Sequence, residues 1–284
     1  MERYYAFGGV ELAVDTPDML QFHAKSMLEP FLVGTLTAPH RFTFRYCEEL
    51  EAPLGELVAE APTYCIYHAV DTTIRYLGEV QGGWQNACAR VENCDRTHRV
   101  QINRKQYPIQ LTEKTVLNCL GTEHLVVQAG GVVFHSSYIR YRDTGILFTA
   151  PSGTGKSTQA DLWEKLRGAE IINGDRSVIR ADENGVFACG IPFAGSSDIC
   201  KNKTLPLSGI VYLRQAPTTT IRRLQGAEAF RRVWEGCSVN SWDKQDMELA
   251  SETVLRVLKT VPIFELACTP DESAVIALEG AMEA

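Results

Sequence analysis

Residues 150–157, Ala-Pro-Ser-Gly-Thr-Gly-Lys-Ser, have the types and spacing that bind a polyphosphate, and we call them the glycine loop. Small residues let consecutive backbone N–H groups turn toward one anion. A helix that follows adds the positive end of its dipole. We expect Lys156 to bind the β- and γ-phosphates and the Ser157 hydroxyl to bind Mg²⁺. The predicted nucleotide-binding residues are Ser152, Gly153, Thr154, Gly155, Lys156, Ser157 and Thr158.

The motif departs from the general pattern at its first position, where Ala150 stands in place of glycine. Alanine adds only a methyl group at a position where φ can remain negative. The flanking sequence supports the motif, because an apolar strand precedes it and a helical segment follows, closed by Gly168. The alternative interpretation is a glycine-rich turn that happens to contain a lysine.

Asp175 and His135 are the further candidates for chemistry. Asp175 ends the apolar run 171–175, a strand that we expect beside the strand preceding the glycine loop. An aspartate at such a strand tip binds Mg²⁺ or accepts a proton from an attacking hydroxyl; a Gly-Asp turn is the alternative. All six histidines precede the glycine loop, and His135 lies in the strand just before it. A buried, hydrogen-bonded strand histidine is its alternative reading.

The predicted catalytic residues are therefore Lys156, Asp175 and His135, and the predicted metal ligands are Ser157 and Asp175. The polar segment 190–203 is a long loop between strands, and such loops are often functional. Its Ser196, Ser197 and Lys203 are candidates for holding the substrate, with an ordinary surface loop as the alternative. The arginine pairs 222–223 and 231–232 either neutralise transition-state charge or are simply solvated.

The elements that must position these residues fall into two regions. Up to about residue 107 the sequence predicts short strands at 43–47, 63–70, 72–79 and 99–103, in an antiparallel meander. The charged stretch 90–105 is expected to be a solvated sheet edge. From residue 112 the sequence predicts a helix that ends at the glycine pair 130–131, strands at 132–139 and 145–149, and a helix to about residue 166. Then come strands at 170–173, 177–181, 186–189, 207–213, 219–224 and 263–267, and helices at 243–258 and 270–282.

Composition limits the class of protein. The 284 residues carry a formal net charge of −7, which argues against binding nucleic acid through the whole surface. Nine cysteines without a Cys-x-x-Cys pair indicate reduced thiols. The N-terminus lacks a signal-peptide pattern, and no window approaches 18 consecutive apolar residues. We therefore expect a cytoplasmic protein with no membrane partner.

The order of these motifs resembles the C-terminal kinase domain of the HPr kinase/phosphorylase family, whose P-loop is shared with ATP-dependent phosphoenolpyruvate carboxykinase. The resemblance covers roughly residues 135–213 and rests on His135, the Ser-Gly-x-Gly-Lys-Ser loop and Asp175. It is closer to small HPr-kinase-related serine kinases, which share Gly-x-Pro-x-x-Gly-Ser-Ser at 190–197 and Asn202-Lys203. HPr kinases carry adjacent aspartates at the strand tip, whereas Gly174 occupies the first place here. Their later glycine-rich signature, which is tied to phosphorylase activity, is absent from this sequence.

The resemblance implies an α/β fold with α+β character. A mostly β N-terminal region, 1–110, would precede a P-loop kinase-like domain with a mixed sheet, 111–284. It implies MgATP as cofactor and phosphorylation of a hydroxyl, with serine of a peptide or protein as the expected acceptor. The related kinases form multimers, which makes a homo-oligomer an expectation.

The alternatives are a small-molecule kinase and a nucleotide sensor or scaffold that binds ATP without consuming it, since Gly174 replaces an acid. A nucleic-acid module built on the 90–105 stretch is the reading least favoured by the net charge.

Overall fold

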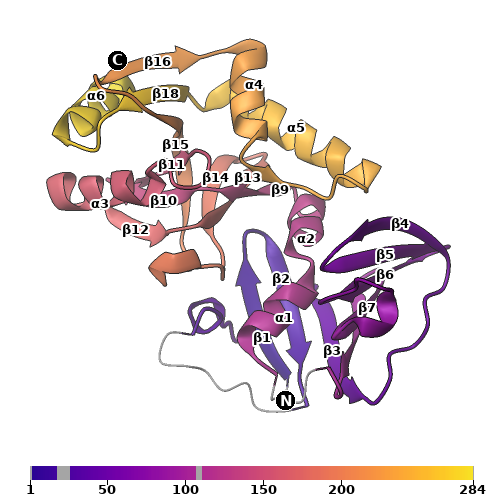
Figure 1. Ribbon diagram of the computed structural model, residues 1–284. Helices are drawn as coiled ribbons and strands as arrows, with labels where there is room; N and C mark the ends of the chain where they lie inside the picture. The colour runs from indigo at the N-terminus through magenta and orange to yellow at the C-terminus, as the bar shows by residue number, and fades with distance from the viewer. Residues whose placement is uncertain (1, 18–25, 107–110, 284) are drawn as a thin grey trace. The chain divides into compact units, whose positions relative to one another are not determined.

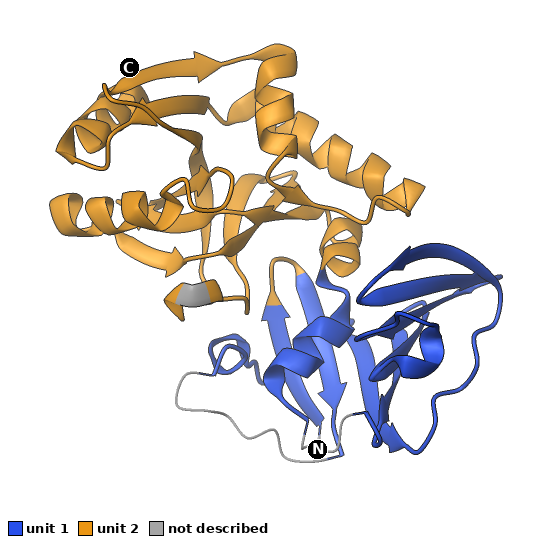
Figure 2. Ribbon diagram, viewed as in Figure 1, with its two compact units in different colours: residues 1–6, 10–122 blue, residues 7–9, 123–284 orange. Residues whose placement is uncertain are grey.

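The protein is an α/β protein with two sheets, described here from a computed structural model that covers residues 2–17, 26–106 and 111–283 (Figure 1). The chain divides into two compact units (Figure 2). Unit 1 is 1–6 with 10–122, and unit 2 is 7–9 with 123–284. The expected domain boundary near residue 110 falls at residues outside the described ranges, and the division between units lies at Thr122.

Unit 1 is built on an eight-stranded sheet of order β1-β2-β3-β8-β7-β6-β5-β4. The strands are β1 Glu2–Phe7, β2 Val10–Asp15, β3 His40–Cys47, β4 Glu56–Ala61, β5 Tyr64–Ala69, β6 Thr72–Leu77, β7 Ala89–Cys94 and β8 Thr97–Asn103. The 3-10 turns η1 Glu29–Phe31 and η2 Trp84–Asn86 and the helix α1 Glu113–Leu120 complete the unit. The antiparallel meander is confirmed for β4 to β8. It is wrong for β3, which pairs in parallel with both β2 and β8.

The expectation of a solvated edge at 90–105 is also wrong. β7 and β8 lie inside the sheet, and the Arg90 side chain is 1% exposed. Its guanidinium donates to Glu92 at 2.7 Å and lies 3.8 Å from Glu51. Pairing of this kind lets a sheet bury a cation. The other basic residues of the stretch, Arg96, Arg99, Arg104 and Lys105, are exposed.

Unit 2 is built on a ten-stranded sheet whose main path is β12-β10-β11-β15-β14-β13-β9-β17, with β18 beside β15 and β16 beside β18. The strands are β9 Gly131–His135, β10 Ser137–Tyr141, β11 Thr144–Thr149, β12 Glu170–Asn173, β13 Arg176–Asp182, β14 Gly185–Gly190, β15 Thr204–Gln215, β16 Thr220–Leu224, β17 Cys237–Ser238 and β18 Ile263–Cys268. The helices are α2 Thr122–Gln128, α3 Lys156–Arg167, α4 Gly226–Trp234, α5 Lys244–Thr260 and α6 Glu272–Glu283, with the 3-10 turn η3 Gly195–Ser197.

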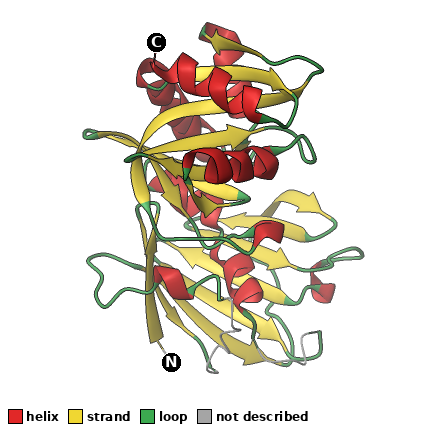
Figure 3. Ribbon diagram, turned by 90° about the vertical axis from the view of Figure 1, so that its left-hand side faces the viewer, coloured by secondary structure: helices red, strands yellow, loops and turns green. Residues whose placement is uncertain are grey.

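Helices cover both faces of the unit 2 sheet (Figures 1 and 3). Successive residues of a strand point to opposite faces. Ile146 and Phe148 of β11 accordingly pack with Trp163 of α3 and with residues of α6. Leu147 between them joins the opposite cluster, which contains buried residues of α4 and α5. The strand that leads into the glycine loop is thus fixed by a core on each side.

Three local predictions differ from the structure. The single helix expected after Thr112 breaks at Gly121, which adopts a left-handed conformation between α1 and α2. The strand expected at 132–139 divides at Ser136, so that β9 pairs with β13 while β10 pairs with β11 and β12. β12 therefore does not lie beside β11, because β10 stands between them. No helix in the described ranges is long and apolar enough to cross a membrane.

A buried carboxylate joins α2 to α5. Asp246 has 0% exposure and accepts hydrogen bonds from His124 Nδ1 at 2.9 Å and Asn240 Nδ2 at 2.9 Å. It also accepts one from Gln128 Nε2 at 3.3 Å. A buried carboxylate is tolerated when donors surround it in this way.

We predict that Asp246→Ala lowers the free energy of unfolding by about 2 kcal/mol, because it removes the buried acceptor that ties His124 and Gln128 of α2 to Asn240 and α5. Urea denaturation followed by circular dichroism measures the change. Glu248→Ala, on the exposed side of the same helix, is the control and should change the free energy by less than about 0.5 kcal/mol. Equal effects of the two substitutions would contradict the role given to Asp246.

Candidate functional site

The glycine loop connects the end of β11 to the start of α3. Its residues 151–153 are exposed, and the Thr154 N–H donates to the Pro151 carbonyl at 3.3 Å. Gly153 and Gly155 have φ values of +78° and +118°, and a Cβ on either would meet nothing within 4 Å. Backbone conformation rather than space therefore requires glycine at both positions. Gly155 caps α3 without a side-chain hydrogen bond, so the first turn carries no intrachain side-chain cap.

Lys156 opens α3 and is buried, with 8% exposure. Its Nζ donates to the Ala150 carbonyl at 3.1 Å, which ties the start of the helix to the end of β11. Burial lowers the pKa of the lysine, and the nearby Asp175 carboxylate opposes this shift. Ser157 and Thr158 follow on the exposed side of the first turn. The arrangement holds a partly desolvated cation where an anion would stabilise it.

Asp175 and His135 lie together at the ends of their strands. His135 Nε2 is 3.6 Å from Asp175 Oδ1, and Arg176 Nε is 3.5 Å from Asp175 Oδ2. The imidazole of His135 is the main cause that holds the pKa of Asp175 below its ordinary value. Burial opposes it, while Arg176 and Lys156 add to it. The structure thus brings three predicted residues, His135, Lys156 and Asp175, into one electrostatic neighbourhood, and Asp175 is ionised at neutral pH.

Asn173, a residue that the sequence analysis did not select, positions Asp175. It is fully buried, and its Oδ1 accepts the backbone N–H groups of Asp175 at 3.1 Å and Arg176 at 3.2 Å. Its Nδ2 donates to the Ile191 carbonyl at 2.7 Å. The signal available in the sequence was a single amide at the tip of an otherwise apolar strand. These hydrogen bonds fix the backbone of the turn that carries Asp175.

Backbone hydrogen bonds hold His135 from two sides. Its N–H donates to the Gly236 carbonyl at 2.8 Å, and its carbonyl accepts from Thr149 Oγ1 at 2.9 Å. Thr149 is the last residue of β11, immediately before the glycine loop. The histidine is therefore fixed to the same strand end that carries the loop.

The candidate residues of the segment 190–203 lie at two different places in the fold. Ser197 packs on Gly174, because a Cβ added to Gly174 would lie 2.0 Å from Ser197 Oγ. Ser197 Oγ itself donates to the Ala194 carbonyl at 2.8 Å. Lys203 instead pairs with Glu170, at the opposite end of β12 from Asp175. The Ser196 side chain lies outside the described part of the structure.

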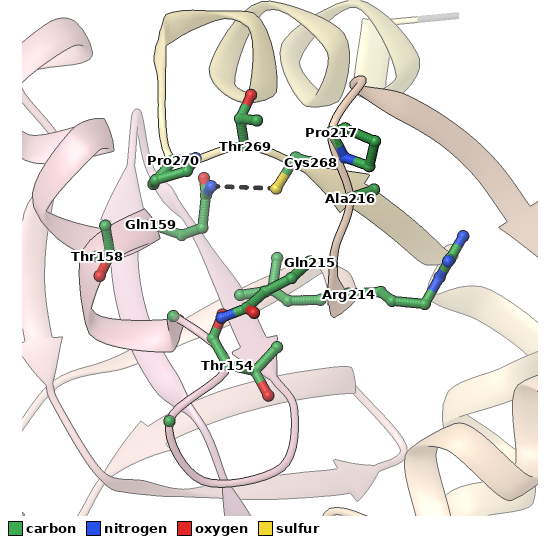
Figure 4. A pocket seen from close by; sticks show the side chains of 13 residues that line it. Thr154, Thr158, Gln159, Arg214, Gln215, Ala216, Pro217, Cys268, Thr269 and Pro270 are labelled. Atoms are coloured by element: carbon green, nitrogen blue, oxygen red, sulfur yellow. Dashed lines mark hydrogen bonds between the residues drawn. The ribbon is translucent and has the colours of Figure 1, made fainter.

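Two pockets adjoin the glycine loop at the carboxyl ends of parallel strands. β11, β15 and β18 run parallel, so their carboxyl ends meet at one edge, where open α/β sheets bind ligands. A pocket of about 530 Å³ lies there (Figure 4). It is lined by Gly153, Thr154, Gly155, Thr158, Gln159, residues 213–217 and residues 268–270. A second, of about 450 Å³, shares Gly153 and Thr154 and adds Ser152, Tyr212 and Arg232.

Oxygen ligands for a magnesium ion are present beside the loop. Asp175 supplies an ionised, half-exposed carboxylate and Ser157 an exposed hydroxyl, both of the hard type that Mg²⁺ prefers. Among the described residues, three ligand-type side chains close enough to share one ion occur at His124, Asp243 and Asp246. Asp246 there is already surrounded by side-chain donors, so this group is accounted for as a structural network.

Comparisons with known proteins do not assign the chain to a family. No family model matches the sequence, and no curated protein matches it. A search of solved structures finds the Hpr(Ser) kinase/phosphatase from Coxiella burnetii, at 13% identity and a TM-score of 0.30. The likeness covers 53% of this chain and 92% of that one. At this TM-score it carries no argument about what the chain does.

We predict that Gly174→Asp lowers the unfolding temperature, because the new side chain must displace Ser197; overpacking of this kind costs about 1–3 kcal/mol. Gly174→Asp combined with Ser197→Gly should recover most of the loss, since it removes the contacting atoms. Gly34→Asp is the control, because a Cβ there meets nothing within 4 Å. Thermal denaturation of the four proteins measures the effect. A single Gly174→Asp protein as stable as the wild type would refute the argument.

Proposed function

We propose that the protein is a phosphotransferase that uses ATP and Mg²⁺ to phosphorylate a hydroxyl group, with serine of a peptide or protein as the leading acceptor class. The observation that carries the proposal is the buried Lys156 beneath an uncapped helix start, next to the His135–Asp175 pair. Phosphoryl transfer depends mainly on positioning and on neutralising charge. A partly desolvated ammonium group and a row of backbone N–H groups provide both.

In this proposal the glycine loop holds the β- and γ-phosphates, and the Lys156 ammonium binds the phosphate oxygen that gains charge. Mg²⁺, when bound, supplies further positive charge to the phosphates. Asp175 and Ser157 are the residues that would hold it. The lowered pKa of Asp175 favours this role over that of proton acceptor, because a weakly basic carboxylate takes up a proton poorly. His135, 3.6 Å from Asp175, then becomes the candidate to receive the acceptor's proton.

The second pocket suits the acceptor. It lies against Ser152 and Gly153 on the glycine loop and is lined by Arg214 and Arg232. The Arg232 guanidinium stacks on Tyr212, 4.3 Å from the ring centroid, and donates to the Tyr212 hydroxyl at 3.2 Å. The same guanidinium pairs with Glu235 at 3.1 Å and lies 3.9 Å from Glu265, so charge on the transferring group would compete with these carboxylates for it.

A second candidate function is nucleotide binding without turnover. Its support is Ser197, which fills the space beside Gly174 where a second acid would stand. Incubation with labelled ATP, Mg²⁺ and a panel of hydroxyl acceptors, alongside an ATP-hydrolysis assay, separates the two functions. Nucleotide that raises the unfolding temperature without any turnover would favour the sensor.

We predict that Lys156→Met lowers phosphate transfer about 100-fold or more, since it removes a charge that acts on the transition state. The same substitution should leave the unfolding temperature of the nucleotide-free protein unchanged or higher, because a buried cation is removed. Lys165→Met, at an exposed position on α3, is the matched control and should change neither quantity. Full transfer activity in the Lys156→Met protein would refute the proposal.

We predict that Asp175→Asn and His135→Gln separate the two roles. Asp175→Asn should raise the Mg²⁺ concentration needed for half-maximal transfer, because it removes a charged ligand. His135→Gln should lower the transfer rate while leaving that concentration unchanged. Magnesium titrations of the initial rate measure both effects. The assignment is reversed if His135→Gln alone shifts the Mg²⁺ requirement.

A further inference from the structure

The 530 Å³ pocket holds a buried amide with an unused hydrogen-bonding atom. Gln159 is 3% exposed, and its Nε2 donates to the Cys268 Sγ at 3.4 Å. Its Oε1 has no hydrogen-bond partner within the described residues. Sulfur is a weak acceptor, so this contact satisfies the amide poorly. Exchanging the oxygen and nitrogen positions of the amide would not remove the problem, because Nε2 would then lack an acceptor.

The walls around this amide suit a flat ring. One side of the pocket is lined by Gly153 and Gly155 of the glycine loop and by Thr158 of α3. Beyond them, Ala216–Pro217 after β15 and Thr269–Pro270 after β18 form mainly apolar walls on opposite sides (Figure 4). A volume of about 530 Å³ falls in the range of small-molecule sites. Gln159 lies between Thr158 and Pro270 in this view, so a ring held between these walls would come within reach of its amide (Figure 4).

Resting on the proposed function, we propose that this pocket binds the base of the nucleotide and that Gln159 makes it selective for adenine. A glutamine amide pairs with adenine through two hydrogen bonds, accepting from N6–H and donating to N7. The Gln159 Oε1 then gains its missing donor, and Nε2 exchanges the weak thiol contact for a ring nitrogen. Guanine presents two acceptors, O6 and N7, at the same edge, which leaves Oε1 unpaired.

Gln159 is a specificity residue in this arrangement and takes no part in the transfer itself. Gln159 closes the first turn of α3, where its N–H donates to the Gly155 carbonyl at 2.9 Å. It lies three residues after Lys156, so the two buried side chains start from neighbouring positions on one face of the helix. The helix therefore fixes the position of the base-reading amide relative to the charge-binding lysine.

Isothermal titration calorimetry of the full chain with Mg²⁺ and three ligands, ATP, GTP and inorganic tripolyphosphate, tests the proposal. We expect ATP to bind about tenfold or more tightly than GTP. Gln159→Leu should reduce ATP affinity about tenfold, toward that of GTP, and leave tripolyphosphate affinity unchanged, since that ligand has no base. The tripolyphosphate measurement also verifies that the variant is folded.

Two analogues test the same contacts in the unmodified protein. Purine riboside triphosphate lacks the 6-amino group and 7-deaza-ATP lacks the N7 acceptor, so each should bind about tenfold more weakly than ATP. Equal affinity for ATP, GTP and both analogues would overturn the base-reading role while leaving phosphate binding intact. Failure of all ligands, tripolyphosphate included, would overturn the proposed function and this inference with it.

Discussion

The buried ammonium group of Lys156 is the interaction on which the proposed site depends. An amine with 8% exposure has lost most of its hydration, and its hydrogen bond to the Ala150 carbonyl replaces only a part. The lowered pKa of the lysine expresses this cost. The free-energy cost of burying this ammonium group is offset by packing elsewhere, because β11 contacts a hydrophobic core on each face and α3 ends at the Gly168 cap. In the proposed function a polyphosphate would supply negative charge beside the buried ammonium group, so a residue that costs stability in the free protein would contribute to binding.

The directions of the strands in the unit 2 sheet decide which chain segments and side chains lie near the glycine loop. Parallel β11, β15 and β18 deliver three chain segments to one edge, where their connections leave two pockets on the glycine loop. The antiparallel part of the same sheet brings in His135 from β9 and Asp175 from the turn between β12 and β13. The parallel strands thus form the edge that carries the two pockets, and the antiparallel strands bring the His135 and Asp175 side chains near the same loop. The buried Asn173 accepts the backbone N–H groups of Asp175 and Arg176, and so fixes the part of the chain that carries the acid.

Local features of this site could be predicted from the sequence, and non-local ones could not. The strand, loop and helix around residues 144–167 are contiguous, so glycine, lysine and apolar periodicity identified them together. The insertion of β10 between β12 and β11 depends on the break at Ser136, whose hydroxyl contacts Ser177 Oγ at 2.7 Å, 41 positions later. No local sequence pattern predicts that Ser177 is the partner of Ser136. The burial of Arg90 could not be predicted, because a run of charges indicates a solvated segment unless Glu92 and Glu51 are known to lie beside it. Gln159 gave no signal, since a polar residue on a helix resembles a solvent-facing one.

The single acid at the strand tip limits the mechanism that the site can support. Two carboxylates could divide metal binding and proton transfer between them, but Ser197 fills the space beside Gly174. A carboxylate whose pKa is held low by His135, and further by Arg176 and Lys156, remains charged and is a weak base. That chemistry suits a metal ligand. In a loose phosphoryl-transfer transition state the attacking hydroxyl keeps its proton until late, so a strong base contributes little. In the proposed function, one acid and a neighbouring imidazole would therefore be enough for transfer, provided that the glycine loop and Lys156 neutralise most of the charge.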